Sequence, residues 1–513
     1  MTDFFNLMQN TTTTENGAVA FNSTLNACLD AFGSLGAMMR SDEKNIIDIF
    51  EKAYNENSVL ALKMLFYMRD VRGGQGQRRV FRVILKWLAE NYPLTVIKNF
   101  DNILFYGRGD DYLCLLDTDI AKDVCVYIAE TLTIDCYKMC KQEDVSLLAK
   151  WLPSENASST ETKRYAAIIR NNLKWTPKQY RIILSKLRKY IDVVERKMSA
   201  NQWANINYNT VPSKASLRYV NSFHKHDEIR YNQYIADLAD GKANINAGVL
   251  FPVDIVHSVL STVRCTTSLV LDAINNASWK ALPNYFGDSE ETGLCVVDTS
   301  ASMSGIPYEV AVSLGIYCAD KCRGPFAGKF ITFSEKPTLE TLKGNNITEN
   351  VRGLKCINAG NTDFEAVFDL ILNTGKTYNV ADSDMPKKLY IISDMQFDAA
   401  RGTHSIYSNY RTKKPFMQQM KEKYREAGYT MPTLIYWNVR QSNCGMFHTT
   451  FEGENCAVVS GYSPSLFKAI IEGTEYETSV DESGEQIISA KVDPMTIMLN
   501  TLNNERYDRV VAD

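Results

Sequence analysis

The 513-residue sequence lacks the features that mark membrane, secreted and disulfide-stabilised proteins. No apolar run approaches the roughly 18 residues of a membrane-spanning helix, and the N-terminus, MTDFFNLMQN, carries no basic and apolar secretion signal. The twelve cysteines include no Cys-x-x-Cys pair, which favours buried thiols in a reducing compartment over disulfides or metal ligation. We therefore expect a soluble, cytoplasmic protein without a membrane partner.

An excess of one charge and the familiar catalytic sets are also missing. The formal net charge of −4 argues against polyanion binding over the whole surface but leaves room for a local basic face. The sequence shows no Ser-His-Asp set, no cysteine nucleophile with a paired base and no recognisable pair of facing carboxylates. His224 and His226, in FHKHDE, point to different faces of a helix, which favours a surface role. Enzymatic activity is therefore not predicted.

The first half of the chain has helical periodicity. After an N-terminal tail, residues 1–24, apolar positions recur at helical spacing over 25–286, for example between Tyr180 and Met198. The helices are short and joined by short turns. This pattern predicts an α-helical domain built as an irregular, HEAT-like repeat array.

The second half alternates strands and helices. Over residues 292–475 we expect strands at 294–297, 329–333, 389–393, 433–437 and 457–460, with amphipathic helices between them. Such alternation predicts a parallel, doubly wound, Rossmann-like α/β domain, in which ligands bind beyond the carboxyl ends of the strands. A C-terminal extension, residues 476–513, is expected to end in a helix that packs on the helical domain.

Polar side chains gather where these strands end. In LCVVDTSASMSG, an extended loop would point Asp298, Ser300 and Ser302 to one side because they alternate. Thr362 opens a later helix and Asp394 ends a later strand. Carboxylate and hydroxyl oxygens suit a hard divalent cation, Mg²⁺ first, with Mn²⁺ or Ca²⁺ as alternatives. The competing explanation is a helix cap, since Asp and Ser are favoured there.

Two basic stretches mark the helical half. A glycine-rich turn in MRDVRGGQGQRR is followed by a helix on which Arg78, Arg82 and Lys86 share a face, an arrangement that fits phosphate. Between Lys163 and Lys197, lysines and arginines outnumber acids by about eleven to two, with aromatic residues interleaved. The alternative for both stretches is a solvated helix face with ordinary ion pairs.

The oxygen-bearing residues carry a resemblance. DTSASMSG, the Thr362 loop and Asp394 resemble the metal-ion-dependent adhesion site (MIDAS) of von Willebrand factor A domains, whose pattern is Asp-x-Ser-x-Ser followed by a distant Thr and a distant Asp. The resemblance implies that Asp298, Ser300, Ser302 and Thr362 ligate the cation and that Asp394 acts directly or through water. It also implies a protein partner that supplies a carboxylate to the remaining position. Asn361 departs from the pattern, because glycine is common before the Thr.

The basic turn carries a second resemblance. MRDVRGGQGQRR is similar to a signature of the helical-repeat (TROVE) domain of Ro autoantigens, which can close into a ring. A plant, phage and giant-virus family of unknown function, which joins such a domain to a von Willebrand A domain, is more similar still. Ro-like proteins bind small structured or misfolded RNAs, so the resemblance implies an RNA-binding ribonucleoprotein component and leaves open whether the gene is cellular, viral or carried by a phage. The residues we assign to RNA are Arg72, Arg78, Arg79, Arg82, Lys86, Arg181, Arg188 and Lys189.

Two functions follow from these patterns. The first is a non-enzymatic RNA-binding scaffold that holds structured RNA or single-stranded RNA ends on a basic face and recruits a partner through a magnesium-binding A domain. The second is a metal-dependent protein-interaction module or virion-associated structural protein without nucleic-acid binding.

Overall fold

The chain folds into two compact units, each built from separated segments. The structure, a computed structural model, describes residues 10–262, 269–288, 293–323, 325–333, 337–354, 363–397, 416–442, 446–480 and 486–512. Unit 1 comprises residues 1–42 and 250–502, and unit 2 comprises 43–249 and 503–513. This division differs from the linear boundaries that the sequence suggests. The N-terminal segment belongs to the same unit as residues 250–502, and the C-terminal segment belongs to the same unit as residues 43–249.

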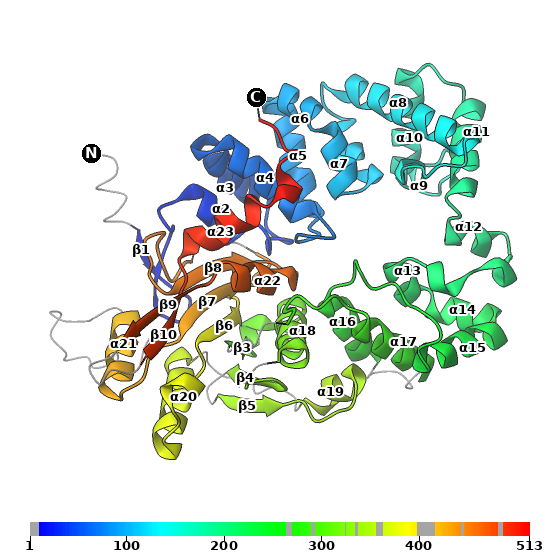
Figure 1. The fold of residues 1–513 in the computed structure, drawn as a ribbon. Coiled ribbons are helices and arrows are strands. Elements are labelled where there is room, and N and C mark those ends of the chain that lie inside the picture. The colour runs from blue at the N-terminus through cyan, green and yellow to red at the C-terminus, as the bar shows by residue number, and fades with distance from the viewer. Residues whose placement is uncertain are drawn as a thin grey trace. The chain divides into compact units, whose positions relative to one another are not determined.

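Unit 2 is helical (Figure 1). Its helices are α3 (Glu43–Glu56), α4 (Ser58–Arg69), α5 (Arg79–Asn91), α6 (Pro93–Lys98), α7 (Phe100–Tyr106), α8 (Ala121–Cys140), α9 (Leu148–Trp151), α10 (Thr160–Asn172), α11 (Pro177–Tyr190), α12 (Val194–Ser199), α13 (Ser213–Arg218), α14 (Val220–His226) and α15 (Glu228–Ala239), with short 3-10 turns η1 (Gly109–Leu115), η2 (Trp203–Asn205), η3 (Tyr208–Thr210) and η6 (Glu505–Tyr507).

Helix α11 shows how the sequence sets these elements. Thr176 and Gln179 form a reciprocal capping box, and Pro177 occupies the first helical turn, where its missing N–H costs nothing. Tyr180, Leu184 and Leu187 are buried on one face. The periodicity predicts one helix to Met198, but the structure ends α11 at Tyr190 and places Asp192 at φ 59°, a left-handed conformation that an α-helix does not tolerate.

The glycine-rich turn between α4 and α5 is folded tightly onto the preceding helix. A Cβ atom on Gly74 would lie 1.9 Å from the carbonyl oxygen of Tyr67, and the N–H of Gln75 donates to that same carbonyl at 3.1 Å. Gly76 adopts φ 61°. These glycines are therefore required by the backbone path, whatever else the turn binds.

The C-terminal residues of the chain dock on unit 2. Arg506 donates from Nη2 to Oδ1 of the fully buried Asp70 at 2.8 Å. The rings of Tyr106 and Tyr507 stack with centroids 5.4 Å apart, and the Asn99 amide donates to the carbonyl of Val511 at 2.7 Å. The predicted final helix, α23 (Pro494–Leu502), belongs to unit 1, and only the residues after it belong to unit 2.

Unit 1 contains a six-stranded sheet (Figure 1). Its strands are β3 (Gly293–Asp298), β4 (Lys329–Phe333), β5 (Thr338–Thr341), β6 (Lys388–Ser393), β7 (Thr433–Asn438) and β8 (Cys456–Ser460), in the order β5-β4-β3-β6-β7-β8. All neighbours are parallel except β5, which pairs antiparallel with β4. The predicted parallel α/β architecture is confirmed. Edge strand β5 was not predicted, because four residues with mixed exposure carry little periodic signal.

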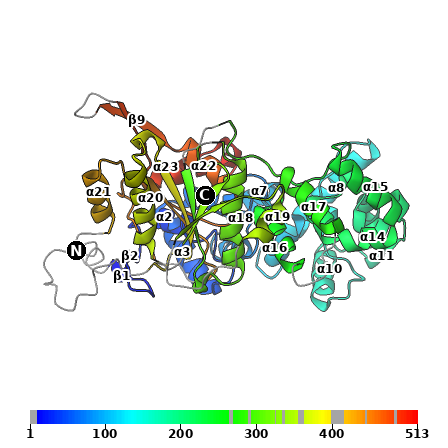
Figure 2. The ribbon, with the colours of Figure 1, turned by 90° about the horizontal axis from the view of Figure 1, so that it is seen from below.

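Helices cover both faces of the sheet (Figure 2). On one face, α20 (Phe364–Tyr378) and α21 (Phe416–Glu426) share a buried cluster with Leu389 and Ile391 of β6. On the other face lie α18 (Ile306–Lys321) and α22 (Ser465–Glu472), and Phe467 of α22 meets the ring of Tyr390 at 5.1 Å. Adjacent residues of β6 thus point into opposite layers, as the pleat requires.

The remaining elements of unit 1 surround this sheet. They are β1 (Thr11–Thr13), β2 (Val19–Phe21), α2 (Ala27–Phe32), α16 (Pro252–Thr262), α17 (Leu269–Lys280), α19 (Ile347–Gly353), β9 (Glu475–Val480) and β10 (Gln486–Lys491), with 3-10 turns η4 (Ala301–Met303) and η5 (Asp382–Asp384). Hairpins β1-β2 and β9-β10 form two separate antiparallel sheets. Among the described residues, no helix has the length and apolarity needed to cross a bilayer.

Gly74 gives a direct test of the turn. We expect Gly74→Ala to destabilise the protein by about 2 kcal/mol or more, because the new methyl group forces the backbone away from the carbonyl of Tyr67. The matched control is Gly248→Ala, where a Cβ atom would meet no neighbour within 4 Å. Urea unfolding of both variants measures the difference. Equal stability would mean that the turn does not follow this backbone path.

Candidate functional site

The first candidate site lies at the carboxyl ends of β3 and β6. These two strands are parallel neighbours, and the strand order reverses between them, since the chain builds outward from β3 to β4 and then returns to β6. A crevice forms at such a reversal point in open α/β sheets. Asp298 is the last residue of β3 and Asp394 directly follows β6. Fold topology therefore brings together two acids that lie far apart in sequence.

Four of the predicted ligands converge there. Asp298 Oδ1 accepts a hydrogen bond from the N–H of Ser300 at 2.9 Å. The hydroxyl oxygens of Ser300 and Ser302 are 3.0 Å apart, and the Ser302 hydroxyl acts to lower the pKa of Asp394. Asp298, Ser300 and Asp394 are buried, whereas Ser302 is exposed, so the cluster opens to solvent on one side.

The carboxyl groups of Asp298 and Asp394 both have raised pKa values. Burial, and then repulsion from Asp394, raises the pKa of Asp298 to about 7. Burial also raises the pKa of Asp394, although the Ser302 hydroxyl and the positive charge of Arg440 act in the opposite direction. Two acids that resist ionisation side by side in a buried crevice create a demand for a cation or a proton.

The donor set fits a hard divalent cation. Adjacent ligands of an octahedral magnesium ion lie about 3 Å apart, which is the separation of the two serine hydroxyls. Asp298, Ser300, Ser302 and Asp394 would supply oxygen ligands, and the cation would offset the repulsion between the acids. Thr362, the fifth predicted ligand, and Asn361 lie outside the described residues. Within the described ranges no three His, Cys, Asp or Glu side chains cluster, so the fit rests on hydroxyls together with two carboxylates.

Residues that the sequence did not single out hold this crevice in shape. The Ser393 hydroxyl donates to Asp298 Oδ2 at 2.5 Å and accepts from the N–H of Met395 at 3.0 Å. Met395 adopts φ 65°, a costly conformation for a side chain of this size. The serine therefore locks the Asp298 carboxylate to the turn that carries Asp394.

The N-terminal hairpin clamps the same turn. The Thr14 hydroxyl donates to the carbonyl of Phe397 at 2.6 Å, and the N–H of Glu15 donates to Gln396 Oε1 at 2.7 Å. The Asn16 amide donates to the carbonyl of Gln396 at 2.7 Å. The predicted N-terminal tail is thus partly a structural element of unit 1, and contacts of this range leave no local sequence signal.

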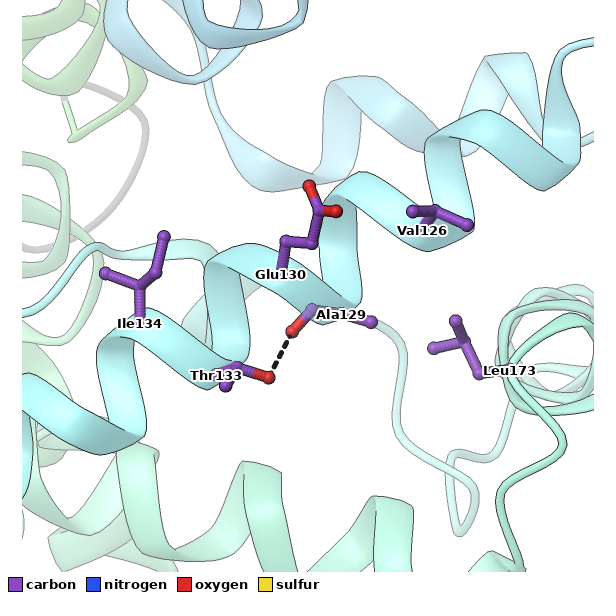
Figure 3. A pocket seen from close by; sticks show the side chains of 6 residues that line it. All are labelled: Val126, Ala129, Glu130, Thr133, Ile134 and Leu173. Carbon is purple, nitrogen blue, oxygen red and sulfur yellow. Dashed lines mark hydrogen bonds between the residues drawn. The ribbon is translucent and has the colours of Figure 1, made fainter.

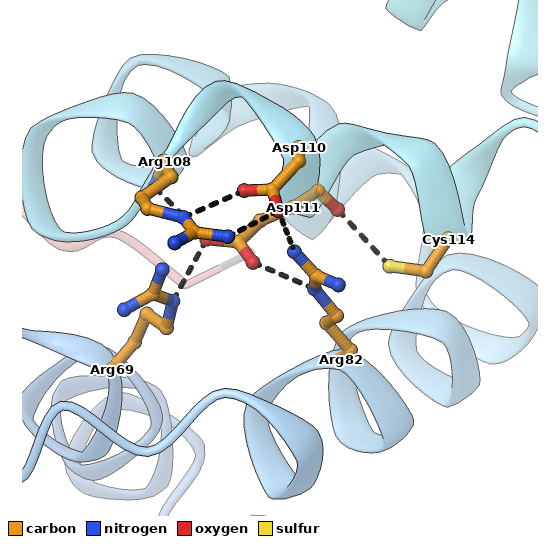
Figure 4. Close-up of polar contacts among 6 residues, drawn as sticks. All are labelled: Arg69, Arg82, Arg108, Asp110, Asp111 and Cys114. Carbon is orange, nitrogen blue, oxygen red and sulfur yellow. Dashed lines mark hydrogen bonds and ion pairs between the residues drawn. The ribbon is translucent and has the colours of Figure 1, made fainter. Parts of the chain in front are cut away.

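The second candidate site is an arginine cluster in unit 2 (Figure 4). The fully buried Asp111 accepts hydrogen bonds from Nε of Arg69 and Nε of Arg82, both at 2.7 Å. Asp110 lies 2.9 Å from Nη2 of Arg82 and also pairs with Arg108. The Arg108 guanidinium stacks 3.9 Å above the ring of Trp151. Most of these groups serve the fold by joining α4, α5 and η1.

The structure separates the basic residues predicted near this cluster. Arg82 is committed to two carboxylates, and Lys86 lies 3.9 Å from Glu90 on its own helix. Arg72, Arg78 and Arg79 are exposed. Among the described residues Arg78 forms no ion pair, and burial together with repulsion from Arg108 lowers its pKa. Of the four arginines in this cluster, Arg69, Arg78, Arg82 and Arg108, Arg78 is the one without an ion pair among the described residues.

Helix α11 presents the other predicted basic residues. Arg188 donates to the carbonyls of Ala149 and Leu152 at 2.8 and 2.7 Å and so serves the fold. Arg181 and Lys189 are exposed, and Lys178 and Lys186 join them on the same side of the helix. The helix contains no acidic residue, and none of these four cations forms an ion pair within the part of the chain that the structure describes. They make a basic face, which we call the α11 face.

An apolar hollow of about 500 Å³ lies along α8 (Figure 3). Val126, Ala129, Ile134 and Leu173 line it, with Glu130 and Thr133 as its polar members. The Thr133 hydroxyl donates to the carbonyl of Ala129 at 2.8 Å and is satisfied within the helix. The hollow offers apolar contact but neither cations nor paired carboxylates, so it is distinct in chemistry from both candidate sites.

Fold and sites together define a class: a two-part protein that joins a helical unit to a parallel α/β unit with an oxygen-rich crevice. Residues 14–107 and 155–284 match the family model described as Domain of unknown function (DUF2828). Residues 292–502 match the model described as Domain of unknown function (DUF7788).

A relative with a similar overall length shares both parts. Uncharacterized protein L728 of Acanthamoeba polyphaga mimivirus is 30% identical over 512 residues, which cover 91% of this chain and 86% of the relative. The chain belongs to the same family as this giant-virus protein.

His448 provides a pH-dependent test of the crevice. Its Nε2 lies 3.1 Å from the carbonyl oxygen of Met395, and burial lowers its pKa to about 4. A neutral histidine in the fold that protonates more readily when unfolded stabilises the protein above about pH 6.5 and loses that stability as the pH falls toward 4. We expect His448→Gln to make the decrease in unfolding free energy between pH 7 and pH 5 shallower by about 2 kcal/mol.

The control for this prediction is His257→Gln, because the His257 side chain is 63% exposed. Urea unfolding at several pH values gives the comparison. Parallel pH profiles for the wild type and His448→Gln would contradict the burial of a neutral imidazole at this position.

Proposed function

We propose that this protein is a non-enzymatic RNA-binding scaffold whose α/β unit binds a divalent cation and, through it, a carboxylate of a protein partner. The cation half rests on one observation: Asp298, Ser300, Ser302 and Asp394 converge at the strand-order reversal of the sheet. Magnesium is the preferred ion, with Mn²⁺ or Ca²⁺ as alternatives.

The topology and the ligand order favour a von Willebrand A-like domain with a MIDAS-type site. A mostly parallel sheet with helices on both faces and acids at the ends of adjacent central strands is the setting that such a site needs. Protein side chains would provide up to five ligands, Thr362 included, and a partner carboxylate would complete the coordination of about six oxygens. The role in this proposal is recognition, in which the ion holds a carboxylate of the partner.

Cation binding is tested with Asp298→Asn. We expect Mg²⁺ and Mn²⁺ to raise the melting temperature of the wild type, because the ion offsets the repulsion between two buried carboxylates. Asp298→Asn should lose this effect and should itself melt higher than the wild type in chelator. The control Asp384→Asn removes the same charge from an exposed position.

Acetate extends the same experiment to the partner. If a carboxylate completes the coordination shell, acetate should tighten Mn²⁺ binding in calorimetry, and Mn²⁺ should tighten acetate binding by the same factor. Cation binding that is unchanged in Asp298→Asn would reject the site, and cation binding without acetate coupling would reject the partner role.

The proposed RNA binding is supported by a separate observation, the α11 face. Four exposed cations that have no ion pair with any described residue, on a helix without an acid, form a local positive surface on a chain of negative net charge. Phosphate backbones are attracted to such a surface regardless of sequence. A HEAT-like helical array of the Ro type would present this face to structured RNA or to single-stranded ends. The alternative, a virion-associated or metal-dependent interaction protein without nucleic acid, predicts no RNA affinity.

Charge reversal separates these two alternatives. We expect Arg181→Glu combined with Lys189→Glu to weaken binding to a single-stranded RNA about tenfold or more, and to reduce the slope of log affinity against log salt by about one to two. Fluorescence anisotropy at several KCl concentrations measures both quantities. The control reverses two exposed lysines of α3, Lys44 and Lys52. The same loss in both double variants would assign binding to net charge and not to the α11 face.

A further inference from the structure

The arginine cluster of unit 2 holds more positive charge than its acids can balance. Four guanidinium groups, Arg69, Arg78, Arg82 and Arg108, interact with two carboxylates, Asp110 and Asp111. Two positive charges are therefore left over among the described residues of the cluster. Surplus charge on a partly buried group of arginines is costly, since like charges repel more strongly away from bulk water.

Arg69 also lacks a full set of hydrogen bonds. The Arg69 side chain is 1% exposed, and its Nε donates to Asp111, but its Nη2 is buried and has no partner among the described residues. An unpaired donor on a buried cation is expensive. Repulsion from Arg108 and Arg82 acts on the same group. Figure 4 shows Arg69 and Arg108 on one side of Asp111 and Arg82 on the other.

Two members of the cluster are accessible. Arg78 is exposed and forms no ion pair among the described residues, and the Arg108 side chain is 22% exposed. The positive charge of Arg108 acts to lower the pKa of Arg78, and the negative charge of Asp110 acts to raise it. A ligand can therefore reach these two arginines from solvent, with the charge of Arg69 behind them.

We propose that Arg78 and Arg108, backed by Arg69, bind the dianion of a phosphate monoester, such as the terminal phosphate of an RNA strand. A monoester carries between about −1.5 and −2 charges at neutral pH, which matches the surplus of the cluster, whereas a backbone phosphodiester carries one. Guanidinium groups bind such oxygens through paired, charge-assisted hydrogen bonds. RNA as the source of the phosphate rests on the proposed function, but the anion site itself does not.

The first experiment uses small anions on the full-length protein. Calorimetry and thermal shift compare inorganic phosphate, methyl phosphate and dimethyl phosphate against chloride at matched ionic strength. We expect the two dianions to bind and to raise the melting temperature, and the diester to behave as chloride does. Equal effects of all four anions would overturn the proposal.

Arg78→Gln tests the assignment, because this side chain forms no ion pair within the described part of the chain. Removal of one charge-assisted contact should weaken phosphate binding about tenfold, and Arg78→Lys should restore part of the affinity. Lys52→Gln, the loss of an exposed charge on α3, should leave it unchanged. Equal phosphate affinity in Arg78→Gln and Lys52→Gln would place the anion elsewhere and overturn the assignment.

A second experiment identifies the source of the phosphate. RNA oligonucleotides of one sequence with a 5′-phosphate, a 3′-phosphate or hydroxyl ends are compared with adenosine monophosphate as competitor. Tighter binding of one phosphorylated strand, lost in Arg78→Gln but kept in the α11 double variant, supports an RNA end. Strong competition by the mononucleotide without any strand preference supports a nucleotide ligand at the same site. RNA binding through the α11 face can fail while phosphate binding persists, so the two proposals are separable.

Discussion

Two carboxylates that share a buried crevice are the constraint on which unit 1 depends. Asp298 and Asp394 end adjacent parallel strands, so the register of β3 against β6 fixes their proximity. Neither side chain can move away without breaking that pairing. Burial and mutual repulsion raise the pKa of Asp298 to about 7. Ionising this carboxyl group in the folded protein therefore costs free energy, a cost that a hydrophobic residue at this position would not carry. Offsetting this repulsion is the task of the cation in the proposed function.

How far the sequence predicts this crevice depends on the range of the contacts. Strands β3, β6 and β7 are six residues long, have apolar central residues and are buried on both faces, so composition and length reveal them. The predicted extended loop is wrong, because Ser302 lies in the 3-10 turn η4 (Ala301–Met303), and it is this turn that brings its hydroxyl to 3.0 Å from that of Ser300. Topology rules place Asp394 nearby. Ser393 and the β1-β2 hairpin escape prediction, because Thr14 meets Phe397 across 383 positions in the sequence. No periodicity encodes a contact of that range.

The glycine-rich turn of unit 2 shows that a motif typical of a binding site can serve the fold instead. Its sequence predicts a phosphate-binding signature, yet most of its residues have structural tasks. Gly74 permits close contact with Tyr67, Asp70 receives the C-terminal Arg506, and Arg69 binds Asp111. A glycine-rich motif of this kind can thus be required by the fold alone. What distinguishes a binding role is the balance of charge. In this cluster there are two more arginines than acids that could neutralise them.

Residues near each end of the chain form hydrogen bonds that hold together the unit to which they belong. The first described residues clamp the turn that carries Asp394, and the last ones cover Asp70 in the turn after α4. The candidate cation site therefore depends on a segment from the far end of the sequence, and neither unit corresponds to a single continuous stretch. Similarity to the mimivirus protein over 91% of this chain is consistent with that dependence, since a fragment of either half would lack part of its own unit. This chain therefore consists of two units interleaved in sequence, so a substitution in residues 10–42 acts on unit 1 and one in residues 503–512 acts on unit 2.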